Sequence, residues 1–588
     1  MTDTKQSRLT ATLLCVTPPD EHQEQGIRAF LQKKYGEDVA LTIQQESSLK
    51  SGFQLHVGSE VYDWSAKGRM EQFRQQVEQL VAKNTRKDII PLLRSSIDEF
   101  RLLAKSSEVG TVKSIGDGIA VVEGLEHAAY GEILMFDNGI KGMVQDLRRN
   151  ETGCILFDNA DDISAGSKVA RTGKTAGVPV GDAFLGRVVD ALGRPIDGGD
   201  AIPADGYRPV EEPAPGIIDR QSVDTPMETG LLSIDAMFPI GRGQRELIIG
   251  DRQTGKTAIA LDAMLNQKGK NVICVYVAIG QKASSVAQLV ENLRKRDAMD
   301  YCVVVSATAG EADTMQYIAP YAGCAMAEYY MHKGRDVLIV YDDLSKHAIA
   351  YRAMSLLLER APGREAYPGD VFYLHSRLLE RSAHLSDKLG GGSMTALPIV
   401  ETQAGDVSAY IPTNIISITD GQIFLESDLF FAGQRPAVNV GLSVSRVGGA
   451  AQTKATKKAT GSLRLDLAQY REMEVFTQFS SDLDDSTKEQ LHYGQGLMRI
   501  LRQKQYHPLS MHQQVIVLVC AMGHVLSKVA VKDVTDFRDA LLEHFEQEHS
   551  DLCRSLEDEK VLTDDMKQEI LRIAEEYLAA NAERFRKE

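Results

Sequence analysis

The sequence predicts a multidomain protein with a small α+β extension, a β-barrel, a parallel α/β core and a helical carboxyl-terminal domain, in that order. Short β-prone segments separated by glycine fill residues 109–174, strands alternate with helices beyond Gly186, and helical periodicity runs from about Lys454 to Glu588. A length of 588 residues and a hydrophobic content of 43% are enough to bury several cores. We place the parts at residues 1–84, 85–108 (a helical linker), 109–175, 176–453 and 454–588.

The amino-terminal extension carries signals of both strand and helix. The predicted elements are strands over 10–16 and 39–44, a helix over 21–35, a hairpin of 52–57 and 60–64 across Gly58-Ser59, and a helix over 68–81. The basic residues Lys83–Lys87 then form a short joint in place of a flexible Gly/Ser linker.

The barrel and the helical domain follow from the spacing of apolar residues. The β-prone barrel segments are residues 110–112, 118–122, 131–135 and 153–156. Their close, regular spacing is typical of a small β-barrel. In the carboxyl-terminal part, residues 462–479 and 564–580 have helical periodicity, with Lys, Glu and Gln on the faces expected to be exposed.

A phosphate-binding loop lies in the predicted α/β core. Its residues match the pattern GxxxxGK[ST] and are Gly250, Asp251, Arg252, Gln253, Thr254, Gly255, Lys256 and Thr257. An apolar run, 247–249, precedes the loop and a helical stretch, 258–265, follows it, as this motif requires. Backbone N–H groups and the helix N-terminus would hold phosphate oxygens, and Lys256 would add a positive charge. The chain is therefore expected to bind a nucleoside triphosphate.

A second segment supplies a carboxylate for the metal that accompanies a triphosphate. The apolar run 337–341 is typical of a buried parallel strand and ends in Asp342. Other strands of the core are predicted over 271–279 and 301–306. We expect the hydroxyl of Thr257 and the carboxylate of Asp342 to hold Mg²⁺, the latter through water.

Composition excludes several classes of function. The chain has 66 Lys and Arg against 82 Asp and Glu, a net charge of −16, which disfavours binding to DNA or to an anionic membrane. No apolar stretch approaches the ~18 residues of a membrane span, and residues 1–8 have no apolar signal-peptide core, so a cytoplasmic location is expected. The cysteines lack CxxC or metal-ligand spacing and are expected to be reduced and mostly buried.

The order of parts and several long motifs resemble the alpha subunits of the F-type ATP synthase head. The motifs are residues 239–246, 250–257, 341–346, 362–370 and 443–452, and the resemblance extends from about Asp88 to the last residue. It implies a RecA-like core, binding of ATP or ADP with Mg²⁺, and alternation with catalytic beta subunits around a gamma shaft. It also implies a complex that couples ATP synthesis or hydrolysis to proton or sodium transport, peripheral to the cytoplasmic face of a bacterial membrane.

Gln281 distinguishes the alpha type from the catalytic type. In the family, beta subunits carry at this position a glutamate that activates the attacking water, and Gln253 is likewise an alpha-type residue. An amide can orient water but cannot take up its proton near neutral pH. The chain's own site should therefore bind Mg-ATP and retain it.

Three other functions would leave different signs in the sequence. An independent P-loop ATPase would need a carboxylate at Gln281, and an RNA-dependent hexameric helicase, which shares the core fold, would be expected to show a basic RNA-binding module. A nucleotide-free paralogue would have lost Lys256 or Thr257, and both are present.

The resemblance assigns the remaining site residues. Arg446 matches the arginine that crosses the subunit interface to the γ-phosphate held by a neighbouring beta subunit, and Ser417 would lie near the same interface. Arg435, Pro436, Gln503 and Gln505 match positions that line the adenine pocket of the chain's own nucleotide.

The extension resembles a different subunit of the same complex. Residues 52–70 are similar to the end of the delta subunit, in the carboxyl-terminal domain that engages the b subunits of the peripheral stalk. The chain thus looks like a fusion of part of delta to alpha, with the remaining delta region as a further partner. An unrelated small α+β appendage remains the alternative.

Overall fold

The computed structural model describes residues 10–19, 21–35, 39–46, 49, 51–58, 60–65, 68, 106–137, 139–158, 163–477 and 485–585. The chain divides into two compact units, Met1–Ala176 and Gly177–Glu588. The helix expected over 68–81, apart from Gly68, the basic joint Lys83–Lys87 and the helical linker expected over 85–108, as far as residue 105, lie outside the described residues. Residues 106–108 are the start of a strand and not part of a helix. Within those residues, no helix combines the length and the apolar character needed to cross a membrane.

The extension forms the α+β fold predicted for it. Its elements are β1 (Thr10–Cys15), α1 (Glu21–Tyr35), β2 (Ala40–Gln45), β3 (Phe53–Val57) and β4 (Glu60–Asp63). β1 lies between β2, which runs parallel to it, and β3, which runs antiparallel. Alternate β1 side chains are buried, and Leu13 packs with Leu31, Leu55 and Tyr62 in a small hydrophobic core.

The barrel is closed, as its strand spacing predicts. Its strands are β5 (Ser106–Gly116), β6 (Ile119–Glu123), β7 (Glu132–Phe136), β8 (Lys141–Leu147), β9 (Glu151–Leu156) and β10 (Lys168–Thr175). Closure comes from the pairing of β10 with β5. β4 also pairs antiparallel with the start of β5, so the sheet of the extension continues into the barrel. The β-prone segments identified in the sequence correspond to β5, β6, β7 and β9, whereas β8 and β10 were not predicted individually.

The second unit is built on an eight-stranded sheet in the order β12-β16-β15-β17-β18-β14-β19-β20. The strands are β12 (Val188–Asp190), β14 (Leu247–Gly250), β15 (Val272–Gln281), β16 (Cys302–Thr308), β17 (Asp336–Asp342), β18 (Ser393–Glu401), β19 (Gly421–Leu425) and β20 (Val444–Ser445). All neighbouring pairs are parallel except β19 with β20. Buried side chains on both faces explain the continuous apolar runs in the sequence. β11 (Gly177–Val180) and β13 (Gly206–Pro209) form a separate two-stranded sheet.

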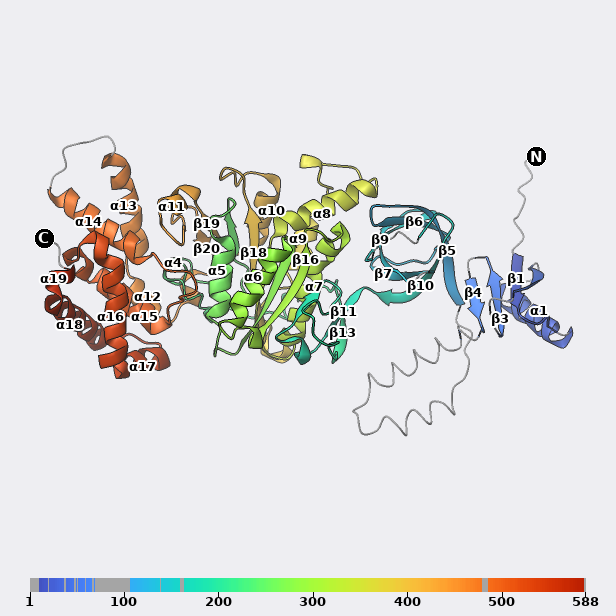
Figure 1. Ribbon diagram of the computed structural model, residues 1–588, viewed down its shortest axis with the longest axis horizontal. Coiled ribbons are helices and arrows are strands. Elements are labelled where there is room, and N and C mark those ends of the chain that lie inside the picture. Colours follow the sequence, from blue (N-terminus) through green and yellow to red (C-terminus); the bar gives the residue numbers. More distant parts are fainter. Residues whose placement is uncertain are drawn as a thin grey trace. The chain divides into compact units, whose positions relative to one another are not determined.

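The direction of the crossovers decides which face each helix covers (Figure 1). The chain moves one way along the sheet through α5 (Lys256–Leu265) and α6 (Ala283–Arg294), and reverses after β16 through α7 (Asp313–Met331) and α8 (Leu344–Leu357). Since such crossovers are right-handed, the two pairs of helices cover opposite faces. Shorter helices follow: α9 (Val371–Leu379), α10 (Tyr410–Ile418) and α11 (Ser427–Phe431). Ligands in such sheets bind at the carboxyl ends of the strands.

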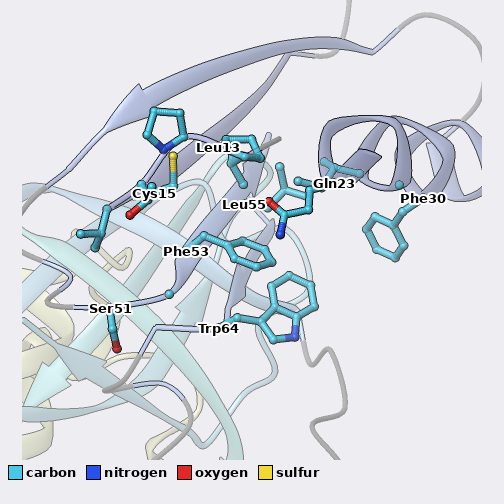
Figure 2. Close-up of a pocket in the computed structure, with 15 residues that line it drawn as sticks. Leu13, Cys15, Gln23, Phe30, Ser51, Phe53, Leu55 and Trp64 are labelled. Atoms are coloured by element: carbon cyan, nitrogen blue, oxygen red, sulfur yellow. The ribbon is translucent and has the colours of Figure 1, made fainter. Parts of the chain in front are cut away.

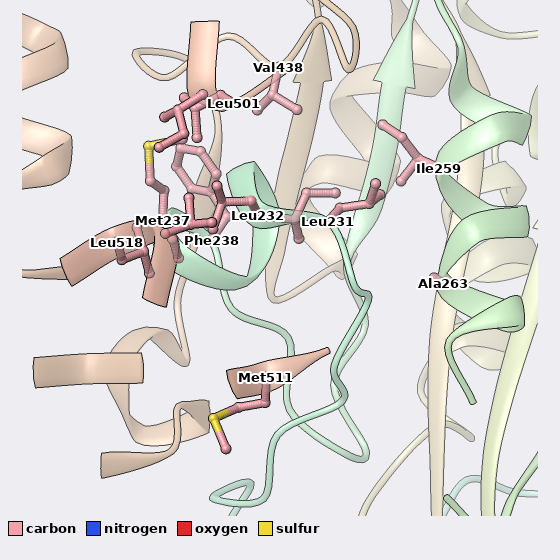
Figure 3. Packing of buried hydrophobic residues seen from close by; sticks show 14 of the residues in the cluster. Leu231, Leu232, Met237, Phe238, Ile259, Ala263, Val438, Leu501, Met511 and Leu518 are labelled. Carbon is pink, nitrogen blue, oxygen red and sulfur yellow. The ribbon is translucent and has the colours of Figure 1, made fainter. Parts of the chain in front are cut away.

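The helical domain shares one hydrophobic cluster with the core. Its helices are α12 (Lys454–Thr460), α13 (Leu463–Thr477), α14 (Asp485–Ile500), α15 (Met511–Met522), α16 (Val534–Glu548), α17 (Ser550–Glu559), α18 (Asp564–Ala580) and α19 (Ala582–Phe585). The short buried helix α4 (Leu232–Met237) joins the two parts. Figure 3 shows Leu231 on the side of Ile259 and Met237 on the side of Leu518. Asp235 of α4 also accepts a hydrogen bond from Gln514 Nε2 at 2.8 Å.

Burial makes one acidic side chain of the core sensitive to pH. Asp262 of α5 is largely buried and accepts a hydrogen bond from the N–H of Tyr506 at 2.8 Å. Burial raises the pKa of its carboxyl to about 6, against a hydrogen bond and Arg296 that lower it. The unfolded chain has a pKa of about 3.9 here, so the folded state binds more protons between about pH 4 and 6. The free energy of unfolding is therefore highest, as far as this group is concerned, below about pH 4, and it decreases as the pH rises to about 6.

We expect the melting temperature of Asp262→Asn to fall less between pH 4 and pH 6 than that of the unmodified protein. At pH 7 the variant should melt at a higher temperature, by a gain in the free energy of unfolding of at most about 3 kcal/mol. Asparagine keeps the oxygen that accepts from Tyr506 but carries no charge. The exposed Asp297→Asn is the matched control and should leave the profile unchanged. A pH profile of Asp262→Asn identical to that of the unmodified protein would contradict the assignment. Calorimetry at a series of pH values measures it.

Candidate nucleotide-binding site

The phosphate loop connects β14 to α5, as its motif predicts. Gly255 precedes the helix with a φ of 96°, a conformation that side chains disfavour. A Cβ on Gly250 would lie 2.6 Å from the carbonyl oxygen of Leu425, so the loop also begins where only glycine fits. Lys256 Nζ donates to the carbonyl oxygens of Gly250 at 2.9 Å and Asp251 at 2.5 Å. Burial lowers the pKa of Lys256, and an anion at the loop would restore its preference for the charged form.

Asp342 is the centre of a hydrogen-bond network beside the loop. Its Oδ2 accepts from Thr257 Oγ1 at 2.7 Å and from the Tyr276 hydroxyl at 2.5 Å. Its Oδ1 accepts from Gln281 Nε2 at 2.9 Å. β15 and β17 are adjacent, with Ala278 opposite Asp342, so the strand ends bring these groups together. The structure therefore unites Thr257, Gln281 and Asp342, which the sequence placed in one site.

Neighbouring polar residues hold the loop in shape. The carboxylate of Asp251 accepts from Thr402 Oγ1 at 2.7 Å, from the Gly405 N–H at 2.9 Å and from Ser427 Oγ at 3.0 Å. Arg252 pairs with Glu401 at 3.1 Å. Sequence reasoning missed Tyr276, Glu401 and these hydroxyls, because each comes from a distant segment and matches no motif.

Asp343 is a second buried carboxylate at the end of β17. It accepts a hydrogen bond from the Lys346 N–H at 2.8 Å and thereby caps α8. Burial, followed by the charge of Asp342, raises its pKa to about 7. Its role in capping the helix distinguishes it from Asp342, which faces Thr257.

The donor set fits a magnesium ion bound with a triphosphate. Mg²⁺ prefers oxygen ligands and reaches proteins through one or two carboxylates or hydroxyls plus phosphate and water. Thr257 Oγ1 and Asp342 Oδ2 are such oxygens and lie 2.7 Å apart. Both stand next to the N-terminus of α5, where phosphate oxygens are favoured.

The residues assigned to the adenine pocket lie on two loops, which meet at Arg435 and Gln503. The N–H of Gln503 donates to the carbonyl oxygen of Arg435 at 2.8 Å. The Arg435 guanidinium lies 4.3 Å from the centre of the Phe430 ring, and Pro436 follows it. The Gln503 side chain donates to the carbonyl oxygen of Gly230 at 2.6 Å and accepts from the Leu232 N–H. Gln503 therefore ties the loop to the core, whereas Gln505 is exposed.

Arg446 and Ser417 lie at the other end of the sheet. Arg446 is exposed, follows β20, and its N–H donates to the carbonyl oxygen of Asp420. Ser417 is exposed on α10 and its hydroxyl donates to the carbonyl oxygen of Thr413 at 2.9 Å. The start of β19 pairs with β20, while its last residue, Leu425, lies opposite Gly250. The intervening length of β19 separates Arg446 from the chain's own phosphate loop by about 13 Å.

All seven cysteines are free and buried, as the sequence predicts. Burial raises the pKa of the Cys154 and Cys520 thiols to about 12, so neither is activated.

Family models match four successive segments of the sequence. Two of them are the ATP synthase alpha/beta family models for the beta-barrel domain, at residues 105–173, and for the nucleotide-binding domain, at 230–445. The model for the C terminal domain of the same alpha/beta subunits matches residues 452–577. The ATP synthase delta (OSCP) subunit model matches residues 1–77.

Curated relatives agree with these models. The ATP synthase subunit alpha of Clostridium botulinum (strain Hall) is 58% identical over 483 residues, which cover 82% of this chain and 96% of the relative. That of Clostridium kluyveri (strain NBRC 12016) is 56% identical over 490 residues, covering 83% and 97%. With its nucleotide loop, closed barrel and helical domain, the chain belongs to the ATP synthase alpha/beta family as an alpha subunit, and it begins with a segment of the delta (OSCP) type.

Proposed function

We propose that this chain binds Mg-ATP at its own site and retains it without hydrolysis. The observation that carries this proposal is the hydrogen bond of 2.9 Å from the Gln281 amide to Asp342. A catalytic site of this family needs a base to take a proton from the attacking water, and Gln281 supplies an amide instead. Asp343 is buried and caps α8, so it is not offered to a nucleotide.

Each residue of the site then has a binding role. Lys256 and the N–H groups at the start of α5 hold the β- and γ-phosphates, and Thr257 and Asp342 hold Mg²⁺, which neutralises phosphate charge. Tyr276 and Gln281 orient Asp342 through its two oxygens. Arg435, Pro436, Gln503 and Gln505 line the pocket for the base on two loops, which the hydrogen bond from the Gln503 N–H to the Arg435 carbonyl oxygen holds together.

The isolated subunit should bind Mg-ATP and release almost no phosphate over many hours. Lys256→Ala should weaken binding at least tenfold, because it removes a charged hydrogen-bond donor to phosphate. Calorimetric titration and a phosphate-release assay measure the two quantities. Lys268→Ala, an exposed lysine beyond α5, is the control. Phosphate release that Lys256→Ala abolishes would show that the site is catalytic after all.

We further propose that Arg446 acts on the nucleotide of a neighbouring beta subunit. The exposed side chain stands at the end of the sheet opposite its own phosphate loop, about 13 Å away. A guanidinium cannot span that distance, but it can enter a site on an adjacent subunit. A planar, permanently charged group suits the charge of a transferring phosphoryl group. Ser417 lies near the same face.

Arg446→Ala in heads reconstituted with beta and gamma subunits should reduce steady-state ATPase by about 10³-fold or more. Arg446→Lys should restore little, because the planar fork is lost. Binding of Mg-ATP to the isolated subunit should be unchanged in both variants. The exposed Arg572→Ala is the control. If ATPase activity fell less than tenfold while the head assembled normally, the proposed role of Arg446 would be refuted.

For the delta-type segment we propose contact with the b subunits of the peripheral stalk. The segment contains an apolar hollow of about 840 Å³ between α1 and the sheet. Figure 2 shows Leu13, Phe53 and Trp64 on the sheet side of this hollow and Phe30 on α1. Such a hollow suits the apolar face of a partner helix. The assembled complex would then lie at the cytoplasmic face of the membrane through its membrane subunits.

A fusion gives every alpha copy such a segment, whereas a single stalk cannot engage all copies equally. The pairing of β4 with β5 supports an arrangement in which each copy is held at its own barrel. We propose that one copy engages the stalk and the others are displaced from it. Fusion raises the effective concentration of the segment at its binding site.

Deleting residues 1–81 should weaken attachment to the stalk and ATP-driven ion pumping while leaving ATPase of the detached head intact. Gly26→Leu is a sharper test, because Gly26 lines the hollow and a Cβ there meets no atom within 4 Å. Leucine should therefore occupy the hollow without disturbing the fold. Gln25→Leu, on an exposed neighbouring position, is the matched control. Full coupling in Gly26→Leu and in the deletion would contradict the stalk role.

A further inference from the structure

We propose that the helical domain carries a zinc-class metal site made by His512, Glu546 and Cys553. The residues belong to α15, α16 and α17 respectively. One ligand atom from each, a ring nitrogen, a carboxylate oxygen and Sγ, lies within 4.8 Å of the others. The site is separate from the nucleotide loop and from Arg446. The sequence does not predict this site, because its three residues are far apart along the chain and only the packing of the helices brings them together.

The arrangement of atoms suits a small tetrahedral metal. Bonds from zinc to nitrogen, oxygen and sulfur are about 2.0–2.3 Å, which places ligand atoms roughly 3–4 Å apart. His512 Nε2 lies 2.8 Å from Glu546 Oε1. Cys553 Sγ lies within the same cluster and donates to the carbonyl oxygen of Phe545 at 3.6 Å. Small side-chain rotations therefore suffice to accommodate the ion.

A second carboxylate orients the histidine. His512 Nδ1 lies 2.8 Å from Glu557 Oε2, and the His512 backbone N–H donates to the same oxygen at 3.1 Å. A carboxylate behind the ring of a metal-binding histidine fixes which nitrogen faces the metal. Here it leaves Nε2 facing Glu546, whose Oε1 lies 2.8 Å away. Gln513 Nε2 likewise donates to Glu546 Oε1 at 3.0 Å, which orients the second ligand.

The donor types favour zinc over magnesium or calcium. A thiolate and an imidazole suit Zn²⁺ and its spectroscopic substitute Co²⁺, while Mg²⁺ and Ca²⁺ prefer oxygen alone. On binding, the metal replaces the hydrogen on Cys553 Sγ, which leaves to solvent as a proton, and it takes the lone pair of His512 Nε2 while Nδ1 keeps its hydrogen toward Glu557. The Glu546 side chain is 43% exposed and the His512 side chain 14%, so the ion enters from the Glu546 side and water completes the coordination.

The site would join the helices that support the nucleotide core. α15 begins at Met511, beside the ligand His512, and its Gln514 donates to the buried Asp235 of α4. Asp235 in turn accepts from the N–H groups of Thr229 and Gly230. A metal that links α15 to α16 and α17 would therefore stabilise the contact between the helical domain and α4 of the nucleotide-binding core.

The test uses the full-length protein, freed of metal with a chelator and then titrated with Zn²⁺ or Co²⁺. We expect uptake of one ion per molecule, a higher melting temperature, and near-ultraviolet absorption from a bond between thiolate and cobalt. Cys553→Ser and His512→Ala should remove that absorption. Glu557→Gln should weaken affinity by about 10–100-fold. Cys520→Ala, a buried cysteine of the same domain, should retain the site.

The cobalt spectrum of the unmodified protein keeps the test informative even where a variant folds poorly. Absence of thiolate absorption at one equivalent of Co²⁺ would overturn the proposal. So would equal uptake by Cys553→Ser and the unmodified protein. In either case the cluster is only a histidine held between two glutamates.

Discussion

The carboxylate of Asp342 is the interaction on which the nucleotide site depends. It receives hydrogen bonds from Thr257, Tyr276 and Gln281, so it links the start of α5 to the ends of two strands. These groups can meet because β15 and β17 are parallel neighbours and end at the same edge of the sheet. The same parallel order sends the amino end of β19, with Arg446 beside it, to the opposite edge. One sheet therefore separates the group that binds nucleotide from the group proposed to act on another subunit.

Much of this could be predicted from local sequence. The phosphate loop and the strand ending in Asp342 are short motifs whose chemistry requires their residue types, and both lie where the structure has them. Helices such as α1 and α18 end at the predicted residues, because their apolar periodicity is continuous. The pairing of β10 with β5 and the order of the sheet depend on contacts between distant segments, which no local pattern encodes.

The same limit applies to side chains. Tyr276 reads as one more apolar strand residue, yet its hydroxyl holds Asp342. The Gln503 side chain donates to the carbonyl oxygen of Gly230 and accepts from the Leu232 N–H, and its position in the sequence does not predict these partners. The cluster of His512, Glu546 and Cys553 is invisible along the sequence for the same reason. Burial and partners, which the fold supplies, decide what such residues do.

The central claim is that the chain's own site keeps ATP intact, and isotope labelling tests it most directly. Heads assembled with labelled γ-phosphate ATP on this subunit would be chased with unlabelled ATP through many turnovers and then analysed. Retention of the label as bound ATP, at about one per copy of the subunit, is the predicted result. Appearance of the label as free phosphate at the rate of turnover would contradict the account.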